Sequence, residues 1–317
     1  MKNINVLAVA VLAVTSASSV LACDFCCVYT AQEALGGGKG FVTGVAEQFT
    51  HFGTMLQDGR EVPNDIGQYL DSSVSQVFAG YNFTKRFGLQ FRLPIIHREF
   101  LRPEGFAIDR GHVSGLGDAL LTANFVLFER KEEEFTFRWS ALGGLKFPTG
   151  SSSRIAEELN EVEVPGTPES GIHGHDLTLG SGSVDGILGS SVFARWKYLF
   201  ATANLQYNAR TKGDFDYQFA NDLQWEVAPG AYLLLNEQHS LALQLVVSGE
   251  TKGKDTFQGA PAEDPAITSV YLGPQLTYTW TDKFSARAGV DLPVSQKNSA
   301  LQTVPDYRIH AAVTWRF

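Results

Sequence analysis

Three cysteines close to the amino terminus are the residues whose type and spacing most suggest chemistry. Cys23, Cys26 and Cys27 are all the cysteines of the 317-residue sequence. Cys23 follows Val20-Leu21-Ala22, which approximates a lipoprotein cleavage box, and a disulfide would suit an oxidising compartment while leaving an odd thiol. Metal or redox chemistry would need further ligands, and Val28 stands where a c-type haem site carries histidine. Lipidation, a disulfide, and a metal or redox role all stay open for this cluster.

His173 and His175 are the other residues that could bind a metal. Together with Asp176 they form a His-x-His-Asp sequence that an extended segment could present on one face. A histidine pair without a distant third ligand is weak support for a metal site, so we expect no metal and no cofactor. The sequence also has no nucleophile elbow, no His-Glu-x-x-His and no phosphate-binding loop, and we expect no enzymatic activity.

The amino-terminal segments indicate the compartment in which these residues are placed. Residues 1–22 begin with Lys2, continue with an apolar run and end in small residues at Ala22, which predicts a secretory signal peptide. Residues 23–40 follow as a segment rich in cysteine and glycine, which could plug a barrel or hang as a tail. No stretch reaches the roughly 20 apolar residues of a transmembrane helix. Residues 41–317 are therefore expected to form the folded part.

The carboxyl-terminal residues 307–317 alternate between apolar and polar side chains and end on Trp315 and Phe317. One face of such a strand is apolar enough for lipid, and the other, with Arg308 and Arg316, is too polar for the core of a soluble sandwich. A mean hydropathy of −0.07 fits a chain in which lipid-facing and lumen-facing residues cancel. The pattern predicts the closing strand of a membrane β-barrel, whose aromatic end is expected to serve as the assembly signal for the barrel-assembly machinery.

About twelve segments alternate in this way, with tight turns and long loops taking turns between them. The expected strands are residues 41–55, 72–84, 87–101, 115–130, 134–148, 183–198, 199–212, 219–235, 239–251, 267–282, 284–295 and 304–317. Aromatic residues gather beside tight turns such as 84–86 and 281–283, as a membrane-interface girdle would. The sequence therefore predicts an all-β fold: a transmembrane antiparallel up-and-down β-barrel of about 12 strands with short periplasmic turns and long extracellular loops, in the outer membrane of a Gram-negative-type bacterium.

The same alternation places charged residues on the face that points into the barrel. A lysine or arginine that faced lipid would cost about 2 to 4 kcal/mol at the midplane, so their placement indicates the phase of each strand. The residues expected to line the lumen are Arg92, Arg98, Asp118, Arg138, Lys146, Asp185, Arg195, Glu226, Arg287, Asp291, Arg308 and Arg316. Opposite charges could pair across the lumen and stiffen the wall, or the basic residues could favour anions. The net charge of −9 comes from acids concentrated in the expected loops.

Short glycine-rich motifs relate the chain to a known family. They are Gly115-Leu116-Gly117-Asp118, Lys146-Phe147-Pro148-Thr149-Gly150 and Gly180-Ser181-Gly182-Ser183-Val184-Asp185. At these positions the chain resembles a broad family of outer-membrane barrels, the transporters of the phenol-degradation MetA type, which is thought to be related to the long-chain fatty acid channels. The resemblance implies the barrel fold, the outer-membrane location and a transport role, whereas the cysteine-rich start puts an aromatic-hydrocarbon substrate in doubt.

Two functions are compatible with these features. The first is an outer-membrane channel or transporter for passive passage of small solutes, hydrophobic or anionic in character. The second is a structural or redox accessory barrel that docks a periplasmic protein partner through Cys23, Cys26 and Cys27. The expected partners are outer-membrane lipid, the assembly machinery and a small-molecule solute, and no nucleic acid is expected.

Overall fold

The fold is described from a computed structural model of the chain, for residues 38–159, 165–262 and 266–317. The expected signal peptide, the cysteine cluster and most of residues 23–40 lie outside these described residues. No helix within the described ranges is long and apolar enough to cross a bilayer.

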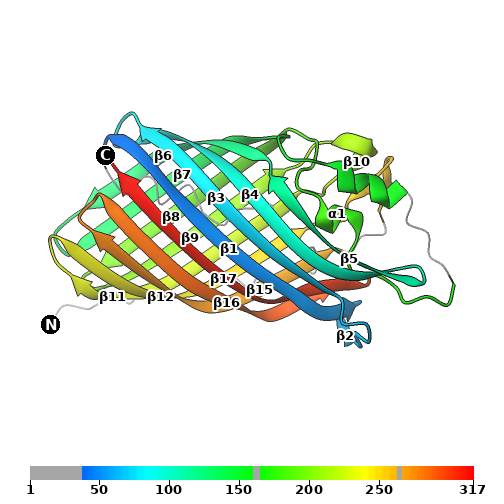
Figure 1. Cartoon of the computed structure of the whole chain (residues 1–317). Helices are drawn as coiled ribbons and strands as arrows, with labels where there is room; N and C mark the ends of the chain where they lie inside the picture. The colour runs from blue at the N-terminus through cyan, green and yellow to red at the C-terminus, as the bar shows by residue number, and fades with distance from the viewer. Residues whose placement is uncertain (1–37, 160–164, 263–265) are drawn as a thin grey trace, which may run out of the picture.

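A closed antiparallel barrel of 12 strands forms the body of the molecule, as the alternation predicts (Figure 1). Its strands are β1 (Gly40–Gln57), β3 (Tyr69–Asn82), β4 (Phe87–Glu104), β6 (Ala119–Lys131), β7 (Phe135–Phe147), β8 (Asp185–Trp196), β9 (Leu199–Ala209), β11 (Asp222–Leu235), β12 (His239–Lys252), β15 (Ile267–Trp280), β16 (Phe284–Asn298) and β17 (Gln302–Arg316). Each strand pairs with its neighbours in the chain, and β17 closes the barrel by pairing with β1.

The first and last strands close the barrel along most of their length. Their register runs from Val42 opposite Arg316 to Leu56 opposite Gln302, with irregularities near Phe52. At the terminal residue, Phe317 N donates to the carbonyl oxygen of Phe41 at 2.9 Å, and Phe41 N donates back to Phe317 at 3.2 Å. The closing strand thus leaves no open sheet edge, which a barrel requires because unpaired backbone groups are costly in lipid.

The two ends of the barrel differ. Tight connections and the carboxyl terminus lie at one end, here called the turn end, which is on the left in Figure 1. Long connections lie at the opposite loop end and carry short elements: β2 (Arg60–Val62), β5 (Ala107–Leu116), η2 (Ser153–Leu159), α1 (Gly174–Leu177), η3 (Asp214–Asp216), β10 (Tyr217–Gln218), β13 (Thr256–Phe257) and β14 (Ala260–Pro261). The stretch 102–114, expected to be a loop, is instead a hairpin in which β5 pairs with β4, so the strand expected at 115 begins at Ala119.

Burial alternates along the strands in the sense opposite to that of a soluble sandwich. On β4 the side chains of Leu89, Phe91 and Ile95 are 36%, 46% and 45% exposed, whereas those of Arg92 and Ile96 are 0% and 1% exposed. Large apolar side chains therefore cover the outside, and charged side chains of the wall such as Arg92 point inward, together with an apolar group on β1, β3 and β4. This distribution is the one expected for a wall with lipid on one side and a polar interior on the other.

Candidate functional site

The connection between β7 and β8 is described at residues 148–159 and 165–184, and these two stretches, here called the central loop, turn into the mouth of the barrel. Its Ile172, Leu177 and Leu179 are buried. They belong to apolar clusters with side chains from the inner faces of β1, β3 and β4: Phe52, Leu70, Val74, Phe78, Ile96 and Phe100. Burying one side chain of this size contributes about 1.5 to 3 kcal/mol. The apolar contacts therefore hold the central loop firmly against this side of the wall.

Hydrogen bonds join the central loop to the connection before β3 and to the start of β17. Gln68 Nε2 donates to the carbonyl oxygen of Glu169 at 3.0 Å, and Gln68 Oε1 accepts from Gly171 N at 2.9 Å. The carbonyl oxygen of Gly171 accepts from the backbone nitrogen of Thr303 at 2.8 Å. A Cβ at position 171 would lie 3.0 Å from that nitrogen, so glycine allows this close passage.

An ion-pair cluster joins the central loop to the β4–β5 hairpin. Arg102 Nη2 lies 2.7 Å from Oε2 of Glu157, and Arg102 Nε lies 3.1 Å from Oδ2 of Asp109. Arg154 Nη1 lies 2.5 Å from the other carboxylate oxygen of Glu157. The side chain of Arg102 is buried, so salt screens its attraction to Glu157 and Asp109 less than it would screen an exposed ion pair. The cluster ties the outer part of the central loop to the hairpin.

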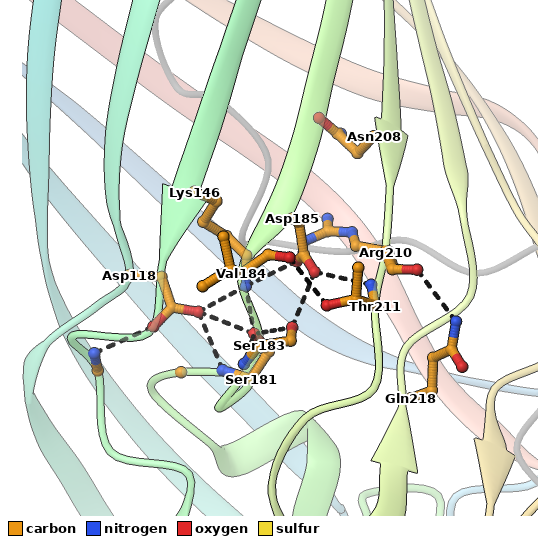
Figure 2. A network of polar contacts seen from close by, with 12 residues as sticks. Asp118, Lys146, Ser181, Ser183, Val184, Asp185, Asn208, Arg210, Thr211 and Gln218 are labelled. Carbon is orange, nitrogen blue, oxygen red and sulfur yellow. Dashed lines mark hydrogen bonds and ion pairs between the residues drawn. The ribbon is translucent and has the colours of Figure 1, made fainter.

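Alternating acids and bases form a buried row along the wall opposite the apolar contacts (Figure 2). Lys146 Nζ lies 2.6 Å from Oδ2 of Asp118 and 2.9 Å from Oδ2 of Asp185. Arg210 Nη1 lies 3.2 Å from the same oxygen of Asp185, and Arg210 Nη2 lies 2.7 Å from Oδ2 of Asp222. These five residues, here called the acid–base row, stand at the loop ends of β6, β7, β8, β9 and β11. Each base contacts two acids and Asp185 contacts both bases, so every buried charge of the row lies next to an opposite charge.

The acid–base row also holds both ends of the central loop. Asp118 accepts from Gly150 N, Ser181 N and Ser181 Oγ, each at 3.0 Å, and Lys146 donates to the Ser181 hydroxyl as well. Ser183 Oγ donates to Asp185 at 2.8 Å. Figure 2 shows these serines between the two carboxylates. The acid–base row therefore fixes the positions at which the central loop enters and leaves the mouth.

His175 forms a second polar cluster within the central loop. Its Nδ1 lies 2.9 Å from Oε1 of Glu158, and its Nε2 lies 3.3 Å from Oδ1 of Asp176. Burial acts to raise the pKa of the Asp176 carboxyl, but the charges of His175 and His173 and the backbone N–H of His173 lower it, and the net pKa lies below the ordinary value. Arg98 Nη1 donates to the carbonyl oxygen of Asp176 at 2.6 Å, so the cluster is attached to β4.

The loops that flank β11 and follow β12 add an outer layer over this cluster. The Tyr217 ring stacks on His175 with centroids 6.1 Å apart, and its hydroxyl donates to Asp255 at 2.6 Å. Lys252 Nζ lies 2.7 Å from the same carboxylate oxygen. The described parts of the central loop thus contact the connections before β3, before β6 and between β9 and β11, as well as the start of β17.

A hydrogen-bonded row crosses the wall at mid-height. Gln275 Nε2 donates to Gln244 Oε1 at 3.0 Å, His310 Nε2 lies 3.2 Å from Gln275 Oε1, and His310 Nδ1 lies 3.3 Å from Oδ2 of Asp291. Gly289 stands in the register between Gln275 and His310. A Cβ at Gly289 would lie 2.5 Å from His310 Nε2, so the glycine lets the imidazole cross the intervening strand.

Three arginines stand on the inner wall near the turn end. Arg195 donates through Nη1 and Nη2 to the carbonyl oxygens of Lys197 and Glu133, both at 3.1 Å, which are neutral acceptors. Arg316 Nη1 contacts the carbonyl oxygen of Asp282 at 3.4 Å, and Arg138 pairs with Glu129 at 2.7 Å. The two carbonyl oxygens that accept from Arg195 carry no net charge, so they do not cancel the positive charge of its guanidinium.

The structure brings together only some of the residues expected to line the lumen. Asp118, Lys146 and Asp185 meet in the acid–base row. The others take separate partners: Arg92 contacts Thr122, Arg98 holds the central loop, Glu226 accepts from Asn204, Arg308 lies 3.5 Å from Glu250, Asp291 contacts His310, and Arg287 faces Ala312 and Thr277 in the register. Their role in conduction stays a prediction.

The remaining candidate residues are two histidines of the central loop and two aromatic residues at the carboxyl terminus. His173 and His175 stack on each other with centroids 5.7 Å apart, and within the described ranges no group of three or more His, Cys, Asp or Glu residues could hold a metal ion. Trp315 packs edge-on against Phe284 with centroids 5.5 Å apart, and Phe317 is exposed, so both lie on the outer surface at the turn end. The expected assembly signal stays a prediction.

Sequence reasoning missed Arg210 and Asp222. Asp222 has the same parity as Glu226, so extending the alternation of β11 by two steps places it inward. Arg210 lies just beyond β9 but inside the strand expected at 199–212, where it shares the inward parity of Gln206 and Asn208, although no pattern in the sequence reveals its partner.

Comparisons with known proteins agree with the fold. No family model and no curated protein matches the sequence. Among solved structures, an outer membrane channel from Pseudomonas putida F1 superposes with a TM-score of 0.62 at 16% identity, covering 89% of this chain and 96% of that one. A Pseudomonas aeruginosa FadL homologue gives a TM-score of 0.38 at 9% identity, covering 92% and 93%, which is too low to support an argument. The chain therefore has the fold of an outer-membrane β-barrel.

Proposed function

We propose that the protein is a passive channel of the outer membrane of a Gram-negative-type bacterium, and that the central loop closes its extracellular end in this conformation. The observation that carries the proposal is the set of contacts among Asp118, Lys146 and Ser181. These contacts hold both ends of the central loop in the mouth of a barrel whose wall carries charged side chains. A loop held by separable contacts can open without unfolding the barrel, because the strands are bonded independently of it.

The solutes that suit this lumen are small and anionic, including amphiphilic carboxylates. Arg195 stands near the periplasmic turns and donates to two carbonyl oxygens, and its positive charge attracts anions toward the wall. Apolar side chains at the mouth, such as Phe78 and Ile96, would contact the apolar part of such a solute once the central loop has left them.

A liposome-swelling assay tests the solute class directly. Proteoliposomes that contain the mature chain are diluted into isotonic solutions of neutral sugars, inorganic anions, aromatic carboxylates and matched cations. The proposal predicts that the carboxylates enter faster than sugars or cations of similar size. Equal rates for all solutes would contradict the anion preference, and no swelling above empty liposomes, even for a variant without the central loop, would contradict the channel itself.

A further inference from the structure

The outer surface of the barrel carries a polar cluster at a depth where lipid is expected. Glu47 stands on β1 between Val45 and Phe49, on the face that points away from the lumen. Its carboxylate accepts from Ser73 Oγ at 2.5 Å and from the Ser75 hydroxyl, both on the outward face of β3. These three residues, here called the Glu47 patch, form a continuous polar area on neighbouring strands, because Glu47 is directly opposite Ser75 in the register.

The Glu47 patch lies at the depth of the membrane interior. Six positions separate Glu47 from Phe41, which is an exposed aromatic residue at the turn end. That separation is roughly 20 Å along a strand, or about 14 Å along the axis of a barrel whose strands tilt by about 45°. The apolar band of such barrels is about 25 Å tall, so the carboxylate falls close to its middle. An ionisable residue at this depth indicates a functional contact.

The apolar band is also shorter on this face than on the other side of the barrel. On β3 the outward apolar residues are Tyr81, Ala79 and Val77, after which Ser75 and Ser73 begin the polar region. Three such residues cover about 9 Å along the axis by the same arithmetic. The outward face of β16 stays apolar from Phe284 through Leu292, which is about twice that height. The bilayer next to β3 would either have to become thinner or surround polar groups with hydrocarbon. Each ångström of difference between the apolar band and the hydrocarbon thickness costs free energy.

We propose that the Glu47 patch is covered by the same patch of a second copy of this chain, in a dimer whose two-fold axis is normal to the membrane. Another copy in the same bilayer has its polar boundary at the same depth, so each copy matches the short apolar band of the other. Around a two-fold axis, one surface meets itself. The patch is suited to this because it contains both a hydrogen-bond acceptor and hydroxyl donors, so each serine can donate to either carboxylate.

The neighbouring side chains allow the two walls to approach closely. Ala79 is the second outward residue after Ser75 on β3, beyond Val77, and Ala311 stands opposite Glu47 on β17. Small side chains and hydroxyl groups are the residues at which membrane-embedded surfaces associate, since they permit van der Waals packing and hydrogen bonds in the absence of a hydrophobic driving force. Strands β17, β1 and β3 lie side by side on the near face in Figure 1, so the dimer would form along the seam where the barrel closes.

Photo-crosslinking in outer membranes tests the proposal. A photoreactive phenylalanine derivative replaces Val77, next to the patch on β3, or, as the matched control, Leu243 on the outward face of β12. We expect a product of twice the chain mass from position 77 and at least tenfold less from position 243. A product with a different protein, equal yields at both positions, or no product from position 77 would each overturn the proposal.

Variants of the patch separate a specific contact from chance collisions. The combined change Glu47→Leu, Ser73→Val and Ser75→Val makes the face apolar and should reduce the product at position 77 at least tenfold. Glu47→Gln keeps the hydrogen-bonding capacity and should retain it. Folding is checked by the heat-dependent electrophoretic mobility of the barrel, and solute entry should be unchanged in all variants. An undiminished product from the apolar variant would contradict a polar interface, whereas loss of solute entry alone would concern only the channel function.

Discussion

Lys146 on β7 and Asp118, directly before the adjacent β6, meet at 2.6 Å in the buried acid–base row, and both also bond to Ser181 of the central loop. The ion pair between two wall residues is thereby part of the contact that closes the mouth. A change that disturbs the pair acts on the loop before it acts on the barrel, because β6 and β7 remain joined by their own backbone ladder.

Replacing Lys146 should open the channel. Lys146→Met leaves Asp118 and Asp185 buried without their shared cation, and breaking a buried pair in this way costs about 3 to 5 kcal/mol. Undocking the central loop relieves that cost by admitting water, so the open fraction of single channels in planar bilayers should rise at least tenfold. Lys197→Met, at an exposed turn, is the matched control and should behave as the wild type. An open fraction unchanged by Lys146→Met would contradict the claim that the acid–base row holds the central loop in the mouth.

The apolar contacts should matter independently of the charges. Leu177→Ala removes a fully buried side chain from the cluster with Phe52 and Phe100, at a cost of about 2 to 5 kcal/mol to the docked loop. Amide hydrogen exchange in residues 165–184 should accelerate by at least tenfold, while the strands keep their protection. Leu199→Ala, at an exposed position on the outer wall, should leave exchange in the central loop unaltered. Uniform acceleration over the whole barrel would mean that Leu177 stabilises the fold rather than the docking.

Strong acid should release the central loop. The pKa of Asp176 is below its ordinary value of about 3.9 in the docked loop. A depressed carboxyl pKa stabilises docking above the ordinary value, and this contribution is lost as the pH falls toward the lower, docked-state pKa. Protease sensitivity of the central loop should therefore increase below about pH 4. Asp176→Asn cannot titrate and should weaken or remove that dependence; the same pH profile in this variant would assign it to another group.

Anion preference should depend on the arginines near the periplasmic turns. Arg195→Gln removes a positive charge that is held by neutral carbonyl oxygens, and the reversal potential in a potassium chloride gradient should shift toward that of a less anion-selective pore. Arg130→Gln is the control, since Arg130 is exposed and pairs with Glu132 outside the lumen. If both variants shift the potential equally, surface charge rather than the lumen sets the preference.

The barrel could be predicted from the sequence because lipid on one side and a polar interior on the other impose a strict alternation on every strand. Arg92 and Leu89 on β4 illustrate this, since their parity alone assigns them to opposite faces. The prediction of a loop at residues 102–114 was wrong, because this stretch lies beyond the membrane and the alternation is not imposed on it. Its pairing into a hairpin depends on backbone partners that no side-chain pattern encodes.

The contacts between the acid–base row and the central loop could be predicted only in part, because they too depend on partners that the alternation does not specify. Asp118, Lys146 and Asp185 follow from the alternation, but that they meet depends on the register of β6, β7 and β8. Ser181 and Leu177 reach the site through the path of the central loop, which is set by tertiary contacts. The inward position of Gln48 next to the outward Glu47 was equally beyond the pattern, because both residues are polar.

Single-channel recording of a variant without the central loop tests the central claim most directly. Residues 152–179 are replaced by a short glycine–serine linker, which keeps Ser181 and the strands, and folding is verified by heat-dependent electrophoretic mobility. The account predicts that the wild type is mostly closed and that the variant conducts continuously with a preference for anions. A correctly folded variant that conducts no more than the wild type would show that the central loop does not close a conducting lumen.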